Sequence, residues 1–356
     1  MDTPKKIRVL VVDDSIVFRE VISRGISSDP GIEVIATARD AFEARDRILE
    51  YEPDVVTCDV EMPGMNGIEF VRRLMPQYPI PIVVVSSVSD AVFATMNSGA
   101  VDFVEKPDAN SVEGVAAFII ELIKKVKIAV AANVSNTKNK NHYYGAAVDK
   151  DGRYAAEAGI SADTGTDCRI IAVGASTGGT EAIHNILKYL PPSIPGIAIV
   201  QHIPPVFSRM FAERLNKSTQ LRVKEAQDGD YIENGCVFVA PGDAHMRIKK
   251  TGGRFKIQVF RSERVSGHCP SVDVLFESVA RECGSKAVGI ILTGMGYDGA
   301  KGLLSMRRSG ARTIGQDEES CVVYGMPKVA YNIGAVEKQV PLADIQRTLL
   351  FMLKKS

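Results

Sequence analysis

Three side chains that together could carry out nucleophilic catalysis lie in the second half of the chain. Ser176 lies in Gly-Ala-Ser-Thr-Gly-Gly, His202 follows a glutamine, and Asp298 lies in a glycine-rich turn. Each of these segments comes directly after an apolar run in the sequence. Side chains that follow the strands of an open α/β sheet gather at one edge of it. A serine hydroxyl needs a base at neutral pH, and the base needs a partner that fixes its tautomer. We therefore predict that Ser176 is a nucleophile, His202 its general base and acid, and Asp298 the residue that orients His202.

Other interpretations of the serine segment stay open at this point. Ser176 could cap the helix expected after the glycines, or the glycine-rich turn could hold a phosphate in a dinucleotide-binding fold. The second interpretation requires an acidic residue near the end of the next strand, where Gln201 and His202 stand instead. A further possibility is a response regulator whose C-terminal domain docks a partner without catalysis.

A second cluster of reactive groups is expected in the first part of the chain. Asp13 and Asp14 close the first apolar run, Asp59 closes the third, and Lys106 follows the fifth. The first and third strands of a doubly wound sheet are neighbours, so the carboxylates would meet, and Mg²⁺ would relieve their repulsion. A carboxylate beside Mg²⁺ can accept a phosphoryl group, and Lys106 could bind one of its oxygens. Taken singly, Asp13 and Asp14 could instead cap the next helix.

Alternating apolar runs and amphipathic segments predict two α/β domains. Residues 1–126 predict a flavodoxin-like domain with a five-stranded, parallel, doubly wound sheet, whose strands are expected at residues 7–12, 33–38, 54–58, 80–85 and 101–104. Residues 127–167 are polar, which indicates a flexible linker. Residues 168–356 predict a Rossmann-like, doubly wound hydrolytic domain, with strands at residues 169–173, 196–200, 236–240, 255–260, 287–292 and 311–315.

Composition and charge argue against several classes of function. The 356 residues include 43 basic and 43 acidic side chains, so no overall charge favours nucleic acid. No apolar stretch is suited to a signal peptide or to membrane insertion. The six cysteines lack Cys-x-x-Cys spacing and are expected as reduced thiols in a cytoplasmic protein.

Residues 5–125 resemble the receiver domain of bacterial response regulators. The motifs that carry the resemblance are Val-Val-Asp13-Asp14-Ser, Cys-Asp59-Val-Glu-Met-Pro-Gly-Met-Asn-Gly, Val-Val-Ser86-Ser and Phe103-Val-Glu-Lys106-Pro. The resemblance implies that a CheA-type histidine kinase phosphorylates Asp59. The residues implied at the Mg²⁺ site are Asp13, Asp14, Asp59 and, through its backbone carbonyl, Glu61. The residues implied in the response to phosphorylation are Ser86, Phe103 and Lys106.

Residues 168–352 resemble the catalytic domain of the chemotaxis protein-glutamate methylesterases, the CheB family. The matching motifs are Gly-Ala-Ser176-Thr-Gly-Gly, Gln-His202-Ile-Pro, Ala-Pro-Gly-Asp243-Ala-His245-Met, Pro270-Ser-Val-Asp273-Val-Leu-Phe and Leu-Thr-Gly-Met295-Gly-Tyr-Asp298-Gly-Ala. A receiver followed by this domain is also the family's own order. The chain differs from the family pattern at Tyr297, where many relatives carry asparagine, and at residues 267–269, a stretch that is usually richer in arginine.

The resemblance implies a phosphorylation-activated esterase that removes methyl groups from glutamates on chemoreceptors and releases methanol. It also implies deamidation of receptor glutamines, because an amide and an ester give the same acyl-enzyme. The substrates implied are the cytoplasmic helices of methyl-accepting chemoreceptors, and no cofactor is expected for the esterase domain. The backbone N–H of Met295 would contribute to an oxyanion hole, with Thr177 and Gln201 nearby.

Overall fold

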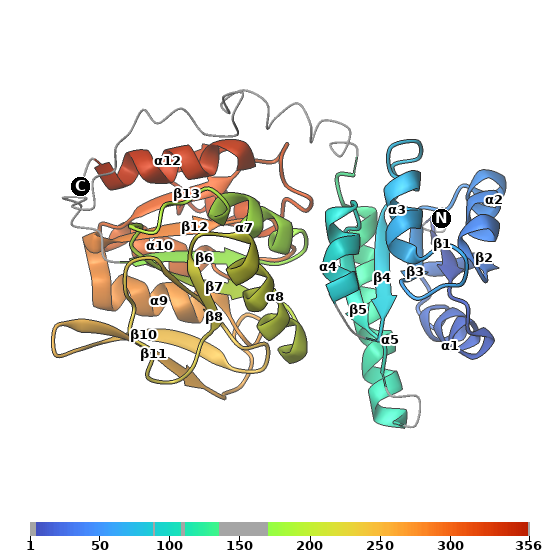
Figure 1. Ribbon diagram of the computed structural model, residues 1–356, viewed down its shortest axis with the longest axis horizontal. Helices are drawn as coiled ribbons and strands as arrows, with labels where there is room; N and C mark the ends of the chain where they lie inside the picture. Colours follow the sequence, from blue (N-terminus) through green and yellow to red (C-terminus); the bar gives the residue numbers. More distant parts are fainter. Residues whose placement is uncertain (1–4, 88–89, 108–110, 135–169, 355–356) are drawn as a thin grey trace. The chain divides into compact units, whose positions relative to one another are not determined.

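The computed structural model describes residues 5–87, 90–107, 111–134 and 170–354. Contacts between Cα atoms divide the chain into two compact units, residues 1–138 and 139–356. The predicted linker, residues 127–167, lies outside the described residues from position 135 onward. Each unit is built on its own sheet (Figure 1).

The first unit contains a five-stranded sheet in the order β2-β1-β3-β4-β5, and every pairing is parallel. Its strands are β1 (Ile7–Val12), β2 (Ile32–Ala38), β3 (Val55–Asp59), β4 (Ile82–Ser86) and β5 (Asp102–Glu105). Its helices are α1 (Ile16–Ile26), α2 (Ala41–Tyr51), α3 (Gly67–Leu74), α4 (Asp90–Asn97) and α5 (Val112–Val130). Helix α1 packs beside α5, and α3 packs beside α2 and α4, so helices cover both faces of the sheet. The predicted flavodoxin-like, doubly wound fold is confirmed.

Helix α5 is held by a cap at one end and an apolar stripe along its length. The Ser111 hydroxyl accepts a hydrogen bond from the Gly114 N–H at 3.0 Å, the N-cap contact. Phe118, Leu122 and Val126 recur every four residues and are buried against the sheet. Burial continues at 128 and 129, so regular structure overlaps the first residues of the predicted linker.

The second unit contains a seven-stranded sheet in the order β14-β13-β12-β6-β7-β9-β8, again with parallel pairings. Its strands are β6 (Ile170–Ala175), β7 (Gly196–Gln201), β8 (Arg222–Glu225), β9 (Cys236–Val239), β12 (Ala287–Ile291), β13 (Arg312–Gln316) and β14 (Lys338–Val340). This parallel α/β arrangement also confirms the predicted fold class. The middle of the order, β12-β6-β7, places the ends of the three strands that precede Asp298, Ser176 and His202 side by side.

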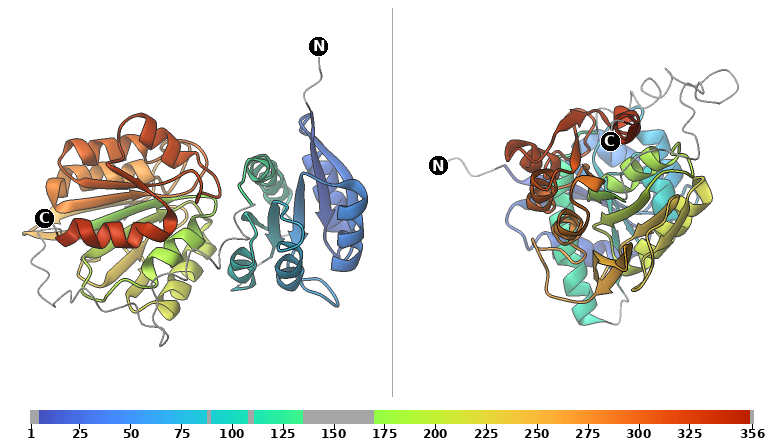
Figure 2. Two further views of the ribbon diagram at one scale, coloured as in Figure 1. Left: turned by 90° about the horizontal axis from the view of Figure 1, so that it is seen from above. Right: turned by 90° about the vertical axis from the view of Figure 1, so that its left-hand side faces the viewer.

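Helices cover both faces of this sheet (Figure 2). They are α7 (Gly179–Leu187), α8 (Pro205–Ser218), α9 (Val272–Cys283), α10 (Ala300–Arg308), α11 (Met326–Asn332) and α12 (Leu342–Lys354), with a short 3-10 helix over Gly284–Lys286. Helix α7 contacts α8 and α12, whereas α10 contacts α9 and α11. The helices therefore form two groups.

One predicted strand belongs to a different structure from the one expected. Residues 255–260 fall in β11 (Arg254–Phe260), which pairs antiparallel with β10 (His245–Thr251) as a separate hairpin instead of joining the parallel sheet. Gly252 and Gly253 form its turn with φ of 58° and 82°, the left-handed conformations that a tight hairpin turn needs. Strands β8, β10 and β14 were not predicted. Charged side chains interrupt the apolar pattern of β8 and of β10, whereas β14 is only three residues long.

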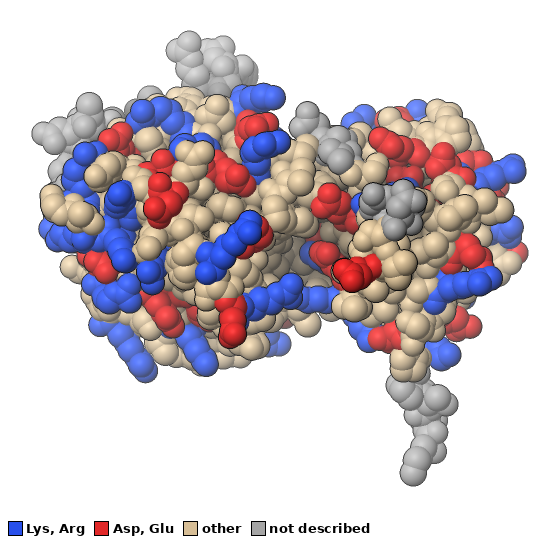
Figure 3. Space-filling view, turned by 90° about the horizontal axis from the view of Figure 1, so that it is seen from below, with Lys and Arg blue, Asp and Glu red and all other residues tan. Residues whose placement is uncertain are grey.

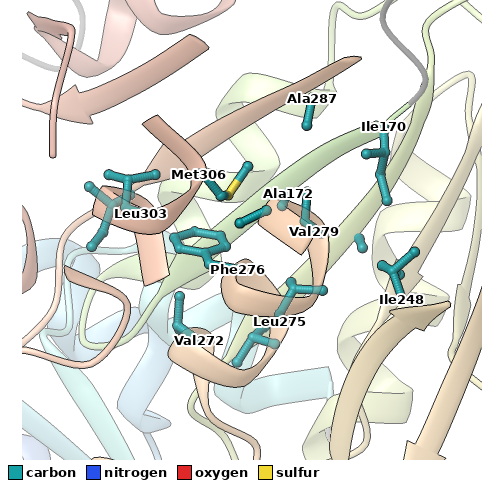
Figure 4. Close-up of a cluster of buried hydrophobic side chains, with 14 of the residues drawn as sticks. Ile170, Ala172, Ile248, Val272, Leu275, Phe276, Val279, Ala287, Leu303 and Met306 are labelled. Carbon is teal, nitrogen blue, oxygen red and sulfur yellow. The ribbon is translucent and has the colours of Figure 1, made fainter. Parts of the chain in front are cut away.

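The start of α9 is pressed against the end of β6. Figure 4 shows Val272, Leu275, Phe276 and Val279 along α9 beside Ile170 and Ala172 of β6. A Cβ atom at Gly174 would lie 2.2 Å from Val272 Cγ1, so only glycine permits this approach. The packing holds the N-terminus of α9 at the sheet edge where Ser176 emerges.

The surface carries no extended region of one charge on the face shown in Figure 3, where basic and acidic side chains are intermixed. Among the described helices, none combines the length and apolarity required to cross a bilayer. The five described cysteines are free thiols.

Candidate active site and phosphoacceptor site

Ser176 lies directly after β6, between the ends of its two neighbouring strands. The Ser176 N–H donates to the Thr293 carbonyl behind β12 at 3.0 Å, and the His202 N–H behind β7 donates to the Ala175 carbonyl at 3.2 Å. The Ser176 residue is 8% exposed. The backbone therefore places the hydroxyl-bearing residue between the segments that carry His202 and Asp298.

The turn after Ser176 is held by several specific contacts. Gln201 Nε2 donates to the Ser176 carbonyl at 2.8 Å, and the Gly179 N–H donates to the same oxygen at 2.7 Å. Gly178 has φ of 76° and is the N-cap residue of α7, with no side-chain cap. Ser176 is therefore not the cap of this helix, and that alternative is wrong.

His202 and Asp298 form a hydrogen bond across the end of β6. His202 Nε2 lies 2.9 Å from Asp298 Oδ2, and the Asp298 residue is 1% exposed. His202 Nδ1 is buried and has no hydrogen-bond partner among the described residues.

The N-terminus of α9 holds the Asp298 carboxylate. Oδ1 accepts hydrogen bonds from Ser271 Oγ at 2.7 Å and from the Asp273 N–H at 3.0 Å, and Oδ2 accepts one from the Val272 N–H at 2.8 Å. Burial by itself raises the pKa of the Asp298 carboxyl, but the hydrogen bonds from His202 and from this backbone outweigh it, and the pKa lies below its ordinary value. An ionised Asp298 only accepts hydrogen bonds, so a neutral His202 carries its proton on Nε2 and has a lone pair on Nδ1.

Sequence reasoning assigned no role to residues 271–273. The signal was present, since serine before an apolar helical run is the usual N-cap pattern. The sequence pattern does not predict that the start of this helix binds the side chain of Asp298, which lies more than twenty positions further along the chain.

The loop that carries Met295 lies against Ser176. A Cβ atom at Gly294 would be 2.6 Å from Ser176 Cβ. The Gly294 carbonyl accepts hydrogen bonds from the N–H groups of Gly325 at 3.1 Å and Met326 at 2.8 Å, which fixes the peptide before Met295. The position suits a backbone N–H that stabilises an oxyanion near Ser176. Thr177, which is 3% exposed, supports the same loop by accepting a hydrogen bond from Thr293 Oγ1 at 3.0 Å.

Gly294→Ala should reduce turnover by about 10²-fold, because the new methyl group would overlap Ser176 Cβ and push Ser176 aside, and a displacement of about 1 Å can cost that much. Steady-state kinetics and thermal unfolding would be measured together. Gly296→Ala is the matched variant: Gly296 has φ of 91° but nothing within 4 Å of a Cβ, so it adds backbone strain without crowding Ser176. Equal turnover in the two variants would contradict the predicted crowding.

The other histidines of this unit occupy different environments. His245 is fully buried, with Nδ1 accepting from the Ser271 N–H at 3.2 Å and Nε2 lying 3.0 Å from the Glu263 carbonyl, so it supports the α9 start. His184 is half-buried on α7, and burial lowers its pKa. His268 stacks on His202 with ring centroids 3.7 Å apart. Sequence reasoning did not anticipate this contact.

In the first unit, the predicted carboxylates and lysine do meet at one edge of the sheet. Lys106 Nζ lies 2.7 Å from Asp13 Oδ2 and 2.6 Å from Asp59 Oδ2. Burial by itself lowers the pKa of Lys106, but the bonds to Asp13 and Asp59 outweigh it and hold the pKa above its ordinary value. Burial raises the pKa of Asp13, and the charge of Asp59 adds to this effect.

These carboxylates are suited to a hard divalent cation. One oxygen from each of Asp13, Asp14 and Asp59 lies within 4.8 Å of the others, and oxygen donors of this kind are what Mg²⁺ prefers. The Glu61 N–H donates to Asp59 Oδ1 at 3.2 Å, which places the Glu61 backbone beside the same carboxylate.

Two of the residues expected to respond to phosphorylation, Ser86 and Phe103, are buried. The alternative in which Asp13 and Asp14 cap the next helix is wrong. The Ser86 hydroxyl is buried without a hydrogen-bond partner among the described residues. Phe103 is 4% exposed and packs edge-on against Phe93 at 6.4 Å between ring centroids. The N-cap of α1 is Ser15, whose hydroxyl accepts from the Phe18 N–H, so neither Asp13 nor Asp14 is the N-cap of this helix.

Comparison with known proteins assigns two families to separate parts of the chain. The CheB methylesterase family pattern matches residues 171–349, and the response-regulator receiver pattern matches residues 9–115. The chain is 53% identical over 351 residues to a Syntrophomonas wolfei protein named protein-glutamate methylesterase/protein-glutamine glutaminase 2, with 99% of both chains covered. It is 45% identical over 350 residues to the protein-glutamate methylesterase/protein-glutamine glutaminase of Salmonella choleraesuis, covering 97% of this chain and 96% of that one. The crystal structure of the Thermotoga maritima CheB methylesterase catalytic domain matches with a TM-score of 0.51 and 36% identity, covering 52% of this chain and 98% of that one.

Proposed function

This chain belongs to the CheB methylesterase family, with a response-regulator receiver ahead of the catalytic domain, and we propose that Ser176, His202 and Asp298 carry out its reaction. It is a protein-glutamate methylesterase and protein-glutamine glutaminase of the chemotaxis adaptation type. The alternative of a regulator that only docks a partner finds no support among these relatives, which are named as enzymes.

The proposed reaction uses two atoms of the site, Ser176 Oγ as the nucleophile and His202 Nδ1 as the base. Ser176 Oγ attacks the side-chain carbonyl carbon of a glutamate methyl ester, and its proton moves to His202 Nδ1. The oxyanion lies against the Met295 N–H. His202 then gives its proton to the methoxy oxygen, methanol leaves, and the glutamyl group stays on Ser176. Water then loses a proton to His202 and attacks this ester. His202 returns the proton to Ser176 Oγ as the glutamate carboxyl group leaves, which restores the enzyme. With glutamine as substrate, ammonia leaves in place of methanol.

The observation that carries this proposal is the His202–Asp298 hydrogen bond, which leaves His202 Nδ1 buried and without a hydrogen-bond partner among the described residues. His202 follows β7, the strand that pairs with β6, behind which Ser176 lies. This arrangement predicts one unusually reactive serine. A fluorophosphonate reagent should add once to the full chain, and peptide mass spectrometry should place the adduct on Ser176. Modification at another serine, or none, would count against this assignment.

The receiver is proposed to control the esterase through phosphorylation of Asp59. Receivers take up phosphoryl groups with the help of a divalent metal, and the carboxylates of Asp13, Asp14 and Asp59 would hold Mg²⁺ together with the Glu61 carbonyl. Lys106 and the unpartnered Ser86 hydroxyl would bind phosphoryl oxygens, and Phe103 would move with Ser86. Phosphorylation would come from a CheA-type histidine kinase.

The proposed substrates are glutamate methyl esters on the cytoplasmic helices of methyl-accepting chemoreceptors, which places the enzyme in the cytoplasm. No nucleic acid partner and no membrane insertion are proposed. The esterase reaction as written needs only the three side chains, the Met295 backbone and water.

Asp59→Asn should abolish phosphoryl uptake from a small phosphodonor such as acetyl phosphate, and with it the rise in esterase activity, because the amide is not a nucleophile. The basal esterase rate should stay unchanged. Phosphate-affinity electrophoresis and methanol release would be measured on the same samples. Asp46→Asn, at an exposed residue paired with Arg45 on α2, is the control. Aspartyl phosphate that still forms in Asp59→Asn and maps to another residue would refute the assignment.

Chelation of divalent metal should likewise stop phosphoryl uptake and leave the basal esterase rate intact. The reason is that carboxylates crowded around Asp59 repel an incoming phosphoryl donor unless a cation offsets their charge. Phosphoryl uptake with and without Mg²⁺ checks this, and equal uptake in both conditions would contradict it.

A further inference from the structure

The ring of His268 covers one face of the His202 imidazole. The two ring centroids are 3.7 Å apart and the planes differ by 3°, so the rings are stacked in parallel at van der Waals contact. The His202 side chain is only 8% exposed. A histidine in contact with the proposed catalytic base, and absent from the proposed reaction, calls for a physical account.

His202 needs a second constraint on its orientation. Its Nε2 is bound to Asp298 at 2.9 Å, whereas its Nδ1 has no hydrogen-bond partner among the described residues. The imidazole turns about its Cβ–Cγ bond, and a hydrogen bond at Nε2 alone limits this rotation less than contacts at both nitrogens would. Such a rotation would displace Nδ1, and proton transfer is sensitive to displacements of about 1 Å.

The segment that presents His268 is built as a tight turn. The Val265 N–H donates to the His268 carbonyl, and the His268 N–H donates to the Val265 carbonyl, both at 3.0 Å. The two central residues have positive φ, 53° at Ser266 and 83° at Gly267, as a two-residue turn of this kind requires. A non-glycine residue such as Ser266 is uncommon in this conformation.

The same helix start that holds Asp298 also holds this turn. Ser266 Oγ donates to Asp273 Oδ2 at 2.8 Å, and the Asp273 N–H donates to Asp298 Oδ1 at 3.0 Å. Burial raises the pKa of the Asp273 carboxyl, and the neighbouring Asp298 charge adds to this effect. The ring that covers His202 and the carboxylate that binds it are therefore fixed to one element, the first turn of α9.

We propose that His268 is a positioning residue, whose ring face holds the plane of His202 so that Nδ1 stays directed toward Ser176. This inference rests on the proposed role of His202 as the base. Two parallel, stacked rings do not present their in-plane nitrogens to each other, so His268 acts on His202 through its face and not by exchanging a proton with it. An aromatic ring without nitrogens should therefore replace it.

His268→Ala should lower kcat about tenfold, the effect expected from the loss of one aromatic stack. KM should change little, because the ring acts on the base. His268→Phe should restore kcat to within about threefold of the wild type, since it supplies the same face. Methanol release from a methylated receptor fragment by the full chain gives both constants, and circular dichroism checks that each variant is folded.

A spectroscopic measurement separates positioning from a general loss of structure. In ¹⁵N-detected spectra of the imidazoles, His202 should show a single tautomer protonated on Nε2 in the wild type and in His268→Phe. In His268→Ala its two nitrogen signals should move toward each other as the ring becomes mobile. His184→Ala, on helix α7 outside the site, is the matched control and should leave both kcat and the His202 signals unchanged.

Wild-type kcat in His268→Ala would overturn the proposal, and so would a His268→Phe variant as slow as His268→Ala. Ser176→Ala is assayed alongside. If Ser176→Ala stays active, the proposed function itself fails. An active His268→Ala beside an inactive Ser176→Ala overturns only the role of His268.

Discussion

Ser176→Ala should lower the rate of methanol release by about 10⁶-fold, the loss found when the nucleophile of a serine triad is removed. The attacking oxygen is deleted, while the backbone bonds that hold the turn, from the Ser176 N–H to Thr293 and from Gln201 to the Ser176 carbonyl, do not involve the side chain. Thermal unfolding should therefore stay close to that of the wild type. Methanol released from methylated receptor fragments is the quantity to measure.

The matched control for this substitution is Ser305→Ala. Ser305 is a partly exposed serine on α10 whose hydroxyl donates to the Lys301 carbonyl, and it should keep wild-type turnover. Turnover in Ser176→Ala that is close to the wild-type value would exclude the nucleophile assignment. Loss of turnover in both variants would point to a general defect instead.

Asp298→Asn should lower kcat by about 10⁴-fold with little change in KM, as loss of the negative partner does in other triads. The carboxylate accepts hydrogen bonds from the Val272 and Asp273 N–H groups on different oxygens, so either orientation of the amide sets its NH₂ group against one of these donors. No orientation supplies the negative charge that stabilises the imidazolium of His202. Steady-state kinetics on purified, folded protein measure the effect.

Combining Asp298→Asn with Ser176→Ala should add almost nothing to the single loss at Ser176, because the members of a triad act as a unit. Asp344→Asn, which removes an exposed carboxylate on α12 paired with Arg347, serves as the control for the loss of one negative charge. Wild-type kcat in Asp298→Asn would show that His202 works without this partner.

Sequence patterns predicted the elements that bring the site together and the residues at their ends. Apolar runs followed by Ser176, His202 and Asp298 became β6, β7 and β12, which are adjacent in the sheet. The reason is physical: a fully buried parallel strand must be continuously apolar, so its end is visible wherever a reactive polar residue interrupts it. The cluster of Asp13, Asp59 and Lys106 was found in the same way.

The contacts that refine the site come from segments without such a pattern. The α9 start that binds Asp298, and the turn at Ser266 that sets His268 on His202, connect residues through tertiary packing and a left-handed backbone conformation. Neither leaves a periodic signal in the sequence. The hairpin of β10 and β11 was missed for a related reason. The exposed lysines of β10 interrupt its alternation of buried and exposed side chains, so the sequence does not show that β10 pairs with β11.

The central claim, hydrolysis of receptor glutamate esters at Ser176, is tested most directly by incubating the full chain with methylated cytoplasmic fragments of chemoreceptors. The account predicts release of methanol, one molecule for each methyl ester lost, with a glutamate carboxyl group at the same position in the fragment by mass spectrometry. A phosphodonor and Mg²⁺ should increase the rate. The claim would be contradicted if the enzyme, folded and phosphorylated on Asp59, released no methanol and the fragments kept their methyl esters.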